Sequence, residues 1–250
     1  MAEKAIITRV HTSPLALDAA AWNALLAQQA HATPFMRHEY LAALHASGSA
    51  VPATGWHPHY VTLEQDGCLI AACPLYLKEH SYGEYIFDWA WARAYQEHGL
   101  AYYPKALVAV PFTPVPGSRL LARDEAARTA LLRAVVAWCE EQSLSSLHLL
   151  FGSEADMAAC KSVGLMQRTT VQFHWKNLAP EGGRFRDFEH FLGALTQDKR
   201  KKIRQEQRRV RDAGVRFRWA HGSDIAAADW NFFYRCYERT YLEHGNPPYL

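Results

Sequence analysis

The sequence lacks several features that would narrow its class at once. Its five cysteines form no CxxC pair and are odd in number, so reduced thiols are expected rather than a disulfide framework. The start, MAEKAIITRV, has no apolar run of the signal-peptide kind, and no window approaches the ~18 apolar residues of a membrane span. We therefore expect a soluble, cytoplasmic protein with no transmembrane segment.

Signatures of common catalytic and metal sites are also missing. No grouping of His, Cys and Asp has the spacing of metal ligands, and no Gly-x-Ser-x-Gly elbow is present. We expect no metal. His148 and His174 fall on expected strands with apolar neighbours, where a hydrogen-bonded core histidine is the ordinary interpretation. The length of 250 residues allows one large or two small domains of ordinary globular composition.

Charge is concentrated in one place. The formal net charge is +2, and residues 199–211 alone carry eight Lys or Arg and one Glu, a local +7 that leaves −5 for the rest of the chain. A helix stabilised by i,i+4 ion pairs would carry acidic and basic residues in similar numbers. The run therefore favours a helix that binds an anion. A solvated helix face is the alternative.

Residues 78–121 have the most unusual composition. Aromatic, His and acidic side chains crowd the first half, and a β-run that ends in a Pro/Gly turn fills the second. The aromatic side chains would be costly to expose, and the carboxylates would be costly to bury unpaired. Such a mixture is typical of the wall of a small-molecule or peptide site. A core helix with a polar face, capping and structural hydrogen bonds are the alternatives. The polar side chains of this wall are His80, Ser81, Tyr82, Glu84 and Asp88.

Apolar periodicity predicts an alternation of strands and helices. Asp66-Gly67 between two alternating apolar runs predicts a hairpin of residues 59–64 and 68–78. The other strands are expected at residues 6–11, 106–112, 145–151, 165–177 and 215–220. Helices are expected at residues 19–30, around 40–44, and at 125–142, 154–164, 188–195, 199–211 and from 230 onward.

The order of these elements resembles GNAT-type acyltransferases in tandem, and more specifically their Fem-like branch, the peptidoglycan biosynthesis and recognition proteins. The segments that carry the resemblance are PFMRHEYLAALHASGS (34–49), HSYGEYIFDWAWARAY (80–95), YYPKALVAVPFTPVPGSRLL (102–121), SSLHLLF (145–151), VQFHWKN (171–177), LTQDKRKKIRQEQRRV (195–210) and HGNPPYL (244–250). The resemblance implies an α/β (α+β) fold with a GNAT-like mixed sheet flanked by helices. Residues 1–178 would form a first GNAT-like domain. Residues 179–250 would form the incomplete start of a second, which contains the basic helix.

In a GNAT fold the acyl donor, usually acyl-CoA, lies where two central strands splay apart, and the turn and helix that follow hold its pyrophosphate. The resemblance implies an acceptor pocket lined by His80, Ser81, Tyr82, Glu84 and Asp88, with Glu84 or Asp88 as the general base. It places the donor turn at residues 113–119. It assigns donor binding to Phe112, Thr113, Gly117 and Arg119, although Arg119 is equally well explained as a surface residue after a turn. The usual Q/R-x-x-G-x-G/A signature is absent. Three prolines, counting Pro111, lack the N–H groups that a phosphate cradle needs.

Fem proteins transfer amino acids from aminoacyl-tRNA to a nucleotide-linked or lipid-linked muropeptide, and both substrates are polyanionic. The resemblance therefore assigns phosphate contacts to Lys199, Arg200, Lys202 and Arg204 on the basic helix. Two function classes follow. The first is an N-acyltransferase that moves an acyl or aminoacyl group from acyl-CoA or aminoacyl-tRNA to an amine in peptidoglycan precursor metabolism. The second is a non-catalytic recognition protein that binds an anionic cell-wall precursor or RNA through the basic helix.

Overall fold

The structure, a computed structural model, describes residues 5–250 and divides into two compact units. Unit 1 contains the residues up to Arg168 together with Tyr249 and Leu250, and unit 2 contains Thr169–Pro248. The sequence places the boundary at residue 178, ten residues further along the chain. The assignment of residues 179–250 to a second GNAT-like domain stays a prediction.

Unit 1 is built on one mixed sheet. Its strands follow the order β1-β2-β3-β4-β6, and β5 pairs with β3. Among the strands of residues 5–250, β4 and β6 are the one parallel pair. The β2–β3 hairpin turns at Asp66 and Gly67, whose φ angles of 53° and 74° are those that this tight turn requires, so the predicted hairpin is confirmed. The strands are β1 Ile6–His11, β2 Trp56–Gln65, β3 Cys68–Lys78, β4 Lys105–Val108, β5 Leu121–Ala122 and β6 Leu147–Leu149.

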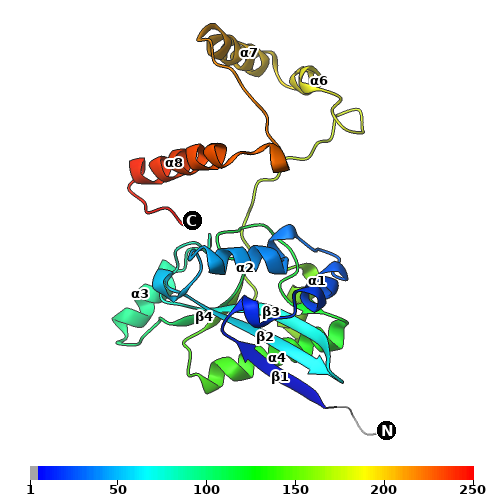
Figure 1. The fold of residues 1–250 in the computed structure, drawn as a ribbon, viewed down its shortest axis with the longest axis vertical. Helices are drawn as coiled ribbons and strands as arrows, with labels where there is room; N and C mark the ends of the chain where they lie inside the picture. Colours follow the sequence, from blue (N-terminus) through cyan, green and yellow to red (C-terminus); the bar gives the residue numbers. More distant parts are fainter. Residues whose placement is uncertain (1–4) are drawn as a thin grey trace. The chain divides into compact units, whose positions relative to one another are not determined.

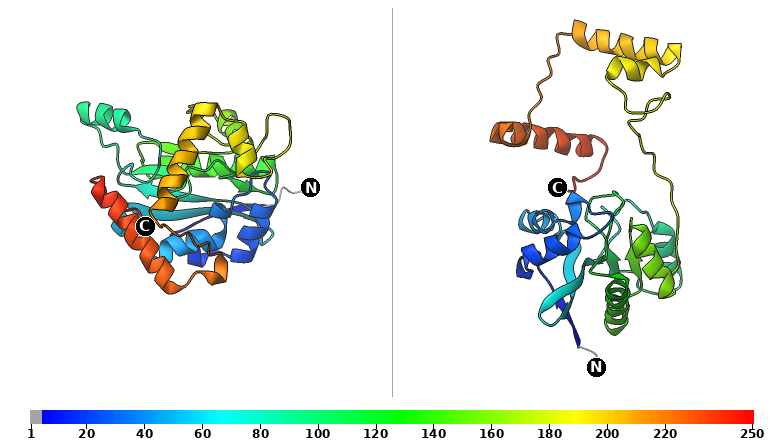
Figure 2. Two further views of the ribbon diagram at one scale, coloured as in Figure 1. Left: turned by 90° about the horizontal axis from the view of Figure 1, so that it is seen from above. Right: turned by 90° about the vertical axis from the view of Figure 1, so that its right-hand side faces the viewer.

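Helices cover both faces of this sheet, which confirms the predicted α/β architecture (Figures 1 and 2). Alternate residues of β2 point to opposite faces. Val61 and Leu63 join a core with α4 and α5, whereas Tyr60 joins a core with α1 and α2. The helices of unit 1 are α1 Ala19–Ala27, α2 His38–Ala46, α3 Trp89–Glu97, α4 Glu125–Glu141 and α5 Glu154–Ser162, with short 3-10 turns at Pro14–Ala16, Pro34–Met36 and Pro52–Thr54.

The strand predicted at residues 106–112 is interrupted. β4 ends at Val108, and β5 later takes up the other half of the same edge of β3. The chain between them, residues 109–120, leaves the sheet. Pro111 has no N–H for a ladder bond, and Phe112, with φ 58°, is in the left-handed region that no strand residue adopts. These two residues explain why the strand is shorter than its apolar run.

Unit 2 contains helices but no strand within its described residues. The strands predicted at residues 165–177 and 215–220 are wrong. Their side chains alternate, but Phe173 is 100% exposed and Trp219 is 86% exposed, with no sheet to pack against. His174 is likewise exposed rather than in a core. Alternation alone does not make a strand, because a strand also needs a hydrogen-bonded neighbour. The helices are α6 Phe188–Gly193, α7 Gln197–Asp212 and α8 Ala227–Glu243, with a 3-10 turn at Gly222–Asp224.

Candidate active site

Two lysines face each other at one end of the sheet. Lys78 ends β3 and Lys105 begins β4, and antiparallel pairing places them directly opposite each other. Both residues are 0% exposed. Like charges in opposite positions destabilise a sheet, and a buried ammonium without a partner is costly. The fold therefore requires acidic partners for at least one of them.

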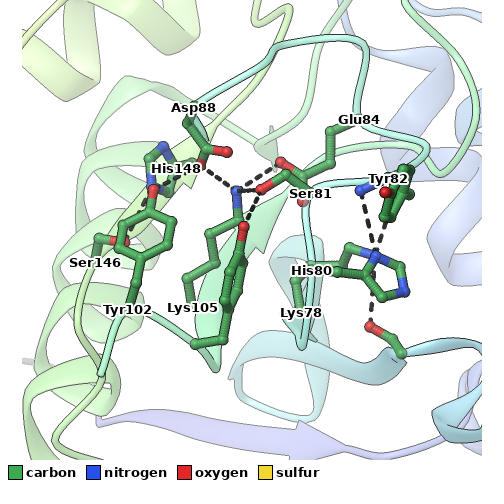
Figure 3. Close-up of polar contacts among 12 residues, drawn as sticks. Lys78, His80, Ser81, Tyr82, Glu84, Asp88, Tyr102, Lys105, Ser146 and His148 are labelled. Atoms are coloured by element: carbon green, nitrogen blue, oxygen red, sulfur yellow. Dashed lines mark hydrogen bonds and ion pairs between the residues drawn. The ribbon is translucent and has the colours of Figure 1, made fainter. Parts of the chain in front are cut away.

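The loop of residues 79–88 supplies those partners. It leaves the sheet after β3 and arches over Lys105 before α3 begins (Figure 3). Gly83 has φ 79°, and a Cβ atom there would lie 2.7 Å from the ring of Phe112. The N–H of Phe112 donates to the carbonyl of Gly83 at 3.1 Å. This close contact fixes the middle of the loop and holds the next residue, Glu84, over the sheet.

Lys105 is the centre of the site (Figure 3). Its Nζ donates to Oγ of Ser81 at 2.9 Å, to Oε2 of Glu84 at 2.8 Å and to Oδ2 of Asp88. These bonds use all three N–H groups of an ammonium. Lys105 therefore positions the carboxylates and has no donor left for a bound molecule. We call Lys78, Ser81, Glu84, Asp88 and Lys105 the lysine–carboxylate cluster.

The two carboxylates of the cluster differ in acidity. Burial raises the pKa of Glu84 above its ordinary value, and the charge and hydrogen bond of Lys105 offset this only in part. Burial also raises the pKa of Asp88, but hydrogen bonds, first that from Lys105, outweigh it and the pKa is lowered overall. Neighbouring groups whose pKa values are pushed apart are typical of an acid–base site. Glu84 suits proton exchange, and Asp88 suits a permanent negative charge.

Each carboxylate also keeps one oxygen free. Within residues 5–250, Oε1 of Glu84 and Oδ1 of Asp88 are buried and have no hydrogen-bond partner. Buried polar atoms in native proteins nearly always have a partner, and the exceptions need an explanation. The lysine–carboxylate cluster therefore has two acceptor oxygens that no group of the described chain uses.

Lys78 is held differently from Lys105. Its Nζ lies 3.6 Å from the ring centroid of Trp56 and 3.4 Å from the carbonyl oxygens of Gly55 and Tyr82. Burial, followed by the charge of the opposing Lys105, lowers the pKa of Lys78 to about 7, although the charge of Glu84 opposes the shift. Long contacts and a lowered pKa suit a lysine that loses its proton near neutral pH.

A line of hydrogen bonds links the cluster to β6. The hydroxyl of Tyr102 donates to Oδ2 of Asp88 at 2.5 Å and lies 3.1 Å from Nε2 of His148 (Figure 3). The same Nε2 lies 3.0 Å from Oγ of Ser146. Burial, followed by the charge of Lys105, lowers the pKa of His148 to about 4. His148 is a neutral, hydrogen-bonded histidine, in line with the ordinary interpretation of its sequence position.

The other residues predicted from this loop lie at the edge of the cluster. Nδ1 of His80 is 3.4 Å from Nζ of Lys78, and Tyr82 is 52% exposed. Tyr82 packs edge-to-face on Trp89, which stacks on Phe87. All three aromatic side chains are exposed. They belong to the loop and to the first turn of α3, a helix with no buried residue rather than a core helix.

The residues predicted to hold an acyl donor lie between β4 and β5. Thr113, Gly117 and Arg119 are buried, and Phe112 is half-buried. The guanidinium of Arg119 donates to two main-chain carbonyls, and burial lowers the pKa of Arg119 to about 10. Arg119 is therefore an interior side chain. Its assignment to a donor stays a prediction.

The four basic residues predicted to bind phosphates lie on α7 in unit 2. Arg200 donates to two main-chain carbonyls at the end of α6, at 3.1 and 2.6 Å. Arg204 forms an ion pair of 2.6 Å with Glu189 of α6. Lys199 and Lys202 are exposed, and their side chains form no ion pair with another residue in the described part of the chain. Two of the four thus hold helices together, and two remain open to a ligand.

Sequence reasoning missed Lys78, Lys105 and Tyr102. The signal for Lys105 was its position, because it opens the apolar run ALVAVPF, where a lysine must be buried with the strand. Its partners lie in a loop that is distant in sequence, and only strand pairing brings them close. Among residues 5–250, no group of three or more His, Cys, Asp or Glu has the arrangement of a metal site. No helix of the described chain has the length and apolarity that a membrane span needs.

The mixed sheet, its single parallel pair and the helices on both faces define unit 1 as a GNAT-type fold. A sequence model of the FemAB-like family, described as peptidoglycan biosynthesis/recognition, matches residues 14–250. The chain belongs to this family. No curated protein matches it.

Several solved structures are similar to the chain at low identity. The aminoglycoside N-acetyltransferase AAC(6')-Iy in complex with CoA has a TM-score of 0.40 and 11% identity over 70% of this chain and 97% of that one. The ribosomal-protein-alanine N-acetyltransferase of Brucella melitensis biovar Abortus 2308 has a TM-score of 0.40 and 13% identity over 69% and 99%. A predicted acetyltransferase with acetyl-CoA from Clostridium acetobutylicum has a TM-score of 0.36 and 12% identity over 69% and 96%. Likeness at this level transfers no substrate and no residue role.

Proposed function

We propose that the chain is an N-acyltransferase in which the lysine–carboxylate cluster receives the acceptor amine and Glu84 takes up its proton. Family membership supports a peptidoglycan precursor as the setting. The observation that carries the proposal is the unpaired oxygen of Glu84, a buried carboxylate whose pKa burial raises above its ordinary value. A base with a raised pKa is closer to the working pH and transfers protons more effectively.

The chemistry assigned to the cluster is the preparation of a nucleophile. An amine that arrives as an ammonium must lose a proton before its nitrogen can form an amide bond. Oδ1 of Asp88 accepts an N–H of the ammonium, because Lys105 and Tyr102 keep Asp88 charged. Oε1 of Glu84 takes the proton, which leaves the nitrogen lone pair free. Glu84 is then a catalytic residue, and Lys105 is a positioning residue.

The basic helix of unit 2 is proposed separately as an anion-binding surface. Lys199 and Lys202 are exposed on α7 and are free to contact phosphates, whereas Arg200 and Arg204 hold α7 to α6. The Lys199→Ala/Lys202→Ala double variant is expected to weaken binding of a nucleotide-linked muropeptide and to flatten its salt dependence, since each lost phosphate contact lowers the slope. An unchanged salt slope in isothermal titration would rule out phosphate binding by this helix.

The test of the base is Glu84→Gln, which keeps the shape of the side chain and removes its basicity. We expect transfer to the nucleotide-linked muropeptide, with acetyl-CoA and aminoacyl-tRNA tried as donors, to fall by roughly 10²–10⁴-fold in kcat. The rise of kcat/KM with pH that a single base gives should disappear with it. The matched control is Glu79→Gln in the same loop, where Glu79 is exposed and bonded to His57. Equal turnover of Glu84→Gln and Glu79→Gln would rule out Glu84 as the base.

A recognition protein without turnover is the second candidate. The observation that favours it is the loop of residues 117–120, whose N–H groups are all bonded within unit 1. In this case the wild-type chain binds the nucleotide-linked muropeptide but transfers nothing to it from either donor. Binding without transfer in the wild type would therefore select this function.

A further inference from the structure

The parallel strands β4 and β6 form the place where a GNAT fold opens for its acyl donor. They pair as far as Val108 and Leu149, and the last bond runs from the N–H of Leu150 to the carbonyl of Val108 at 3.0 Å. In the described structure, no main-chain hydrogen bond joins residues 109–113 to residues 151–155 beyond this point. The two chains have separated, and the carbonyls that follow on the β6 side are open to another partner.

That partner is the chain itself. The carbonyl of Leu150 accepts from Nε of Arg119 at 3.1 Å, and the carbonyl of Phe151 accepts from the N–H of Gly117 at 3.0 Å. Nη2 of Arg119 donates to the carbonyl of Val115 at 2.5 Å, which closes the loop on itself. Residues 114–120 therefore take the hydrogen bonds that an extended ligand between the strands would take.

The N–H groups of this loop are also committed. The N–H of Ser118 donates to the carbonyl of His31 at 3.0 Å. Those of Arg119 and Leu120 donate to the carboxylate of Asp156, at 2.8 and 3.2 Å. With Gly117, four consecutive N–H groups are bonded inside unit 1. A pyrophosphate needs several such groups pointing outward, so the residues present do not fit it.

Close packing holds the loop in place. A Cβ atom on Gly117 would lie 2.6 Å from Cγ2 of Thr33 and 3.0 Å from the carbonyl oxygen of His31. Within residues 5–250, Nη1 of Arg119 and Oγ1 of Thr33 are buried without partners. One free N–H and one hydroxyl, both enclosed, are too few for a group with the charge and oxygen atoms of a pyrophosphate.

The helix that follows the loop carries the wrong charge for a phosphate. Asp124 caps α4 and accepts the N–H of Ala127 at 2.8 Å, and Glu125 lies in the first turn. Carboxylates at a helix N-terminus satisfy its N–H groups and neutralise its positive end. The helix terminus that attracts a pyrophosphate in a GNAT fold is already occupied by acidic side chains in this protein.

We infer that residues 114–120 are a built-in plug of the donor opening and that the acyl donor binds outside it. The closure follows from the hydrogen bonds and packing of unit 1 alone. The placement of the donor rests in addition on the proposed transfer reaction. Unit 1 then receives the acceptor at the lysine–carboxylate cluster, and its opening between β4 and β6 is a structural seam rather than a ligand site.

Hydrogen exchange of the full chain, with and without excess acetyl-CoA, tests the plug. The amides of residues 117–120 should exchange slowly in the free protein, because each is bonded, and acetyl-CoA should leave their rates unchanged. Fast exchange in the free protein would overturn the closure. A change of rate at these amides on addition of acetyl-CoA would overturn it as well, since the donor would then reach the loop.

A pair of glycine variants sharpens the test. Gly117→Ala should speed exchange at residues 117–120 by roughly tenfold or more, because the added methyl group overpacks the seam. Gly193→Ala is the control, since no atom lies within 4 Å of its added Cβ, and it should change nothing at these amides. Equal rates in the two variants would contradict the plug. A protected loop beside an inactive transfer assay would remove only the proposed function, whereas a loop altered by acetyl-CoA would remove only the plug.

Discussion

Lys105 and Arg119 are both buried basic side chains of unit 1, but their partners differ. Lys105 is bonded to two carboxylates that each keep a buried oxygen free. The guanidinium of Arg119 is bonded to neutral carbonyls of its own loop and of the chain after β6, and its main-chain N–H donates to Asp156. The first arrangement keeps unused hydrogen-bonding capacity, which is why we propose it as the acceptor site. The second uses nearly all of its hydrogen-bonding groups within the fold. A buried cation therefore indicates a candidate binding site only where its partners keep unused hydrogen-bonding groups. Where all of its partners are used within the fold, it has a structural role.

Lys105→Met should have the largest effect on stability. The change leaves Glu84 and Asp88 buried without their shared cation, and the free energy of unfolding should fall by about 3–5 kcal/mol. Urea denaturation monitored by circular dichroism measures it. Lys105→Met combined with Glu84→Gln and Asp88→Asn removes the unpaired charges and should recover part of the loss. A single variant within about 1 kcal/mol of the wild type would show that the cluster is not held by charge.

Asp156→Ala tests the support around Arg119. The buried carboxylate of Asp156 accepts the N–H groups of Arg119, Leu120 and Ser153, and its loss should cost about 2–3 kcal/mol. The loss should appear in unfolding experiments and leave the affinity for an acceptor amine unchanged. The control is Asp124→Ala, which removes an exposed helix cap worth about 1 kcal/mol. Weakened acceptor binding in Asp156→Ala would mean that the two regions are coupled.

Local sequence patterns were sufficient to predict the layers of unit 1 and to single out three of the five residues of the lysine–carboxylate cluster. The Asp66-Gly67 turn and the alternation on either side of it depend only on neighbouring residues, and they predicted the hairpin correctly. Glu84 and Asp88 were chosen as candidates because a carboxylate among aromatic side chains is costly to bury unless it has a partner. Their partner Lys105 could not be assigned, because it meets them only through the pairing of β3 with β4 and the path of the intervening loop.

The errors have the same origin. A strand at residues 165–177 was predicted from alternation, but no neighbouring strand lies beside it in the described structure. The alternative interpretation of Arg119 as a surface residue is wrong, and it arose because an arginine after a Pro/Gly turn is usually exposed. Its burial depends on carbonyls of residues 115 and 150, one of them 31 positions away in the chain. Sequence spacing carries no information on such contacts.

Lys78→Met should change the pH dependence of stability. Because burial lowers the pKa of Lys78 from 10.5 to about 7, the unfolded chain binds its proton more tightly than the folded chain does. That contribution to stability is present above pH 10.5 and is lost as the pH falls toward 7. The wild type should therefore gain about 1–2 kcal/mol more than Lys78→Met between pH 7 and pH 9. Parallel pH profiles of the two proteins would show that the opposing Lys105 does not force Lys78 toward its neutral form.

Thr33→Val should have the smallest effect, and it tests how completely the plug is closed. The hydroxyl of Thr33 is buried and has no partner within residues 5–250, so an isosteric apolar side chain should leave stability within about 0.5 kcal/mol of the wild type or raise it. The matched change is Thr113→Val in the same region, where the hydroxyl bonds the carbonyl of Pro111 at 2.9 Å and lies 3.3 Å from the hydroxyl of Tyr40. Its loss should cost about 1 kcal/mol. Equal losses in both variants, measured by the same urea denaturation, would mean that Thr33 has a bound partner in solution. The packing beside Arg119 would then admit water or another small molecule. In that case Arg119 and Lys105 would no longer differ in having room for a bound partner.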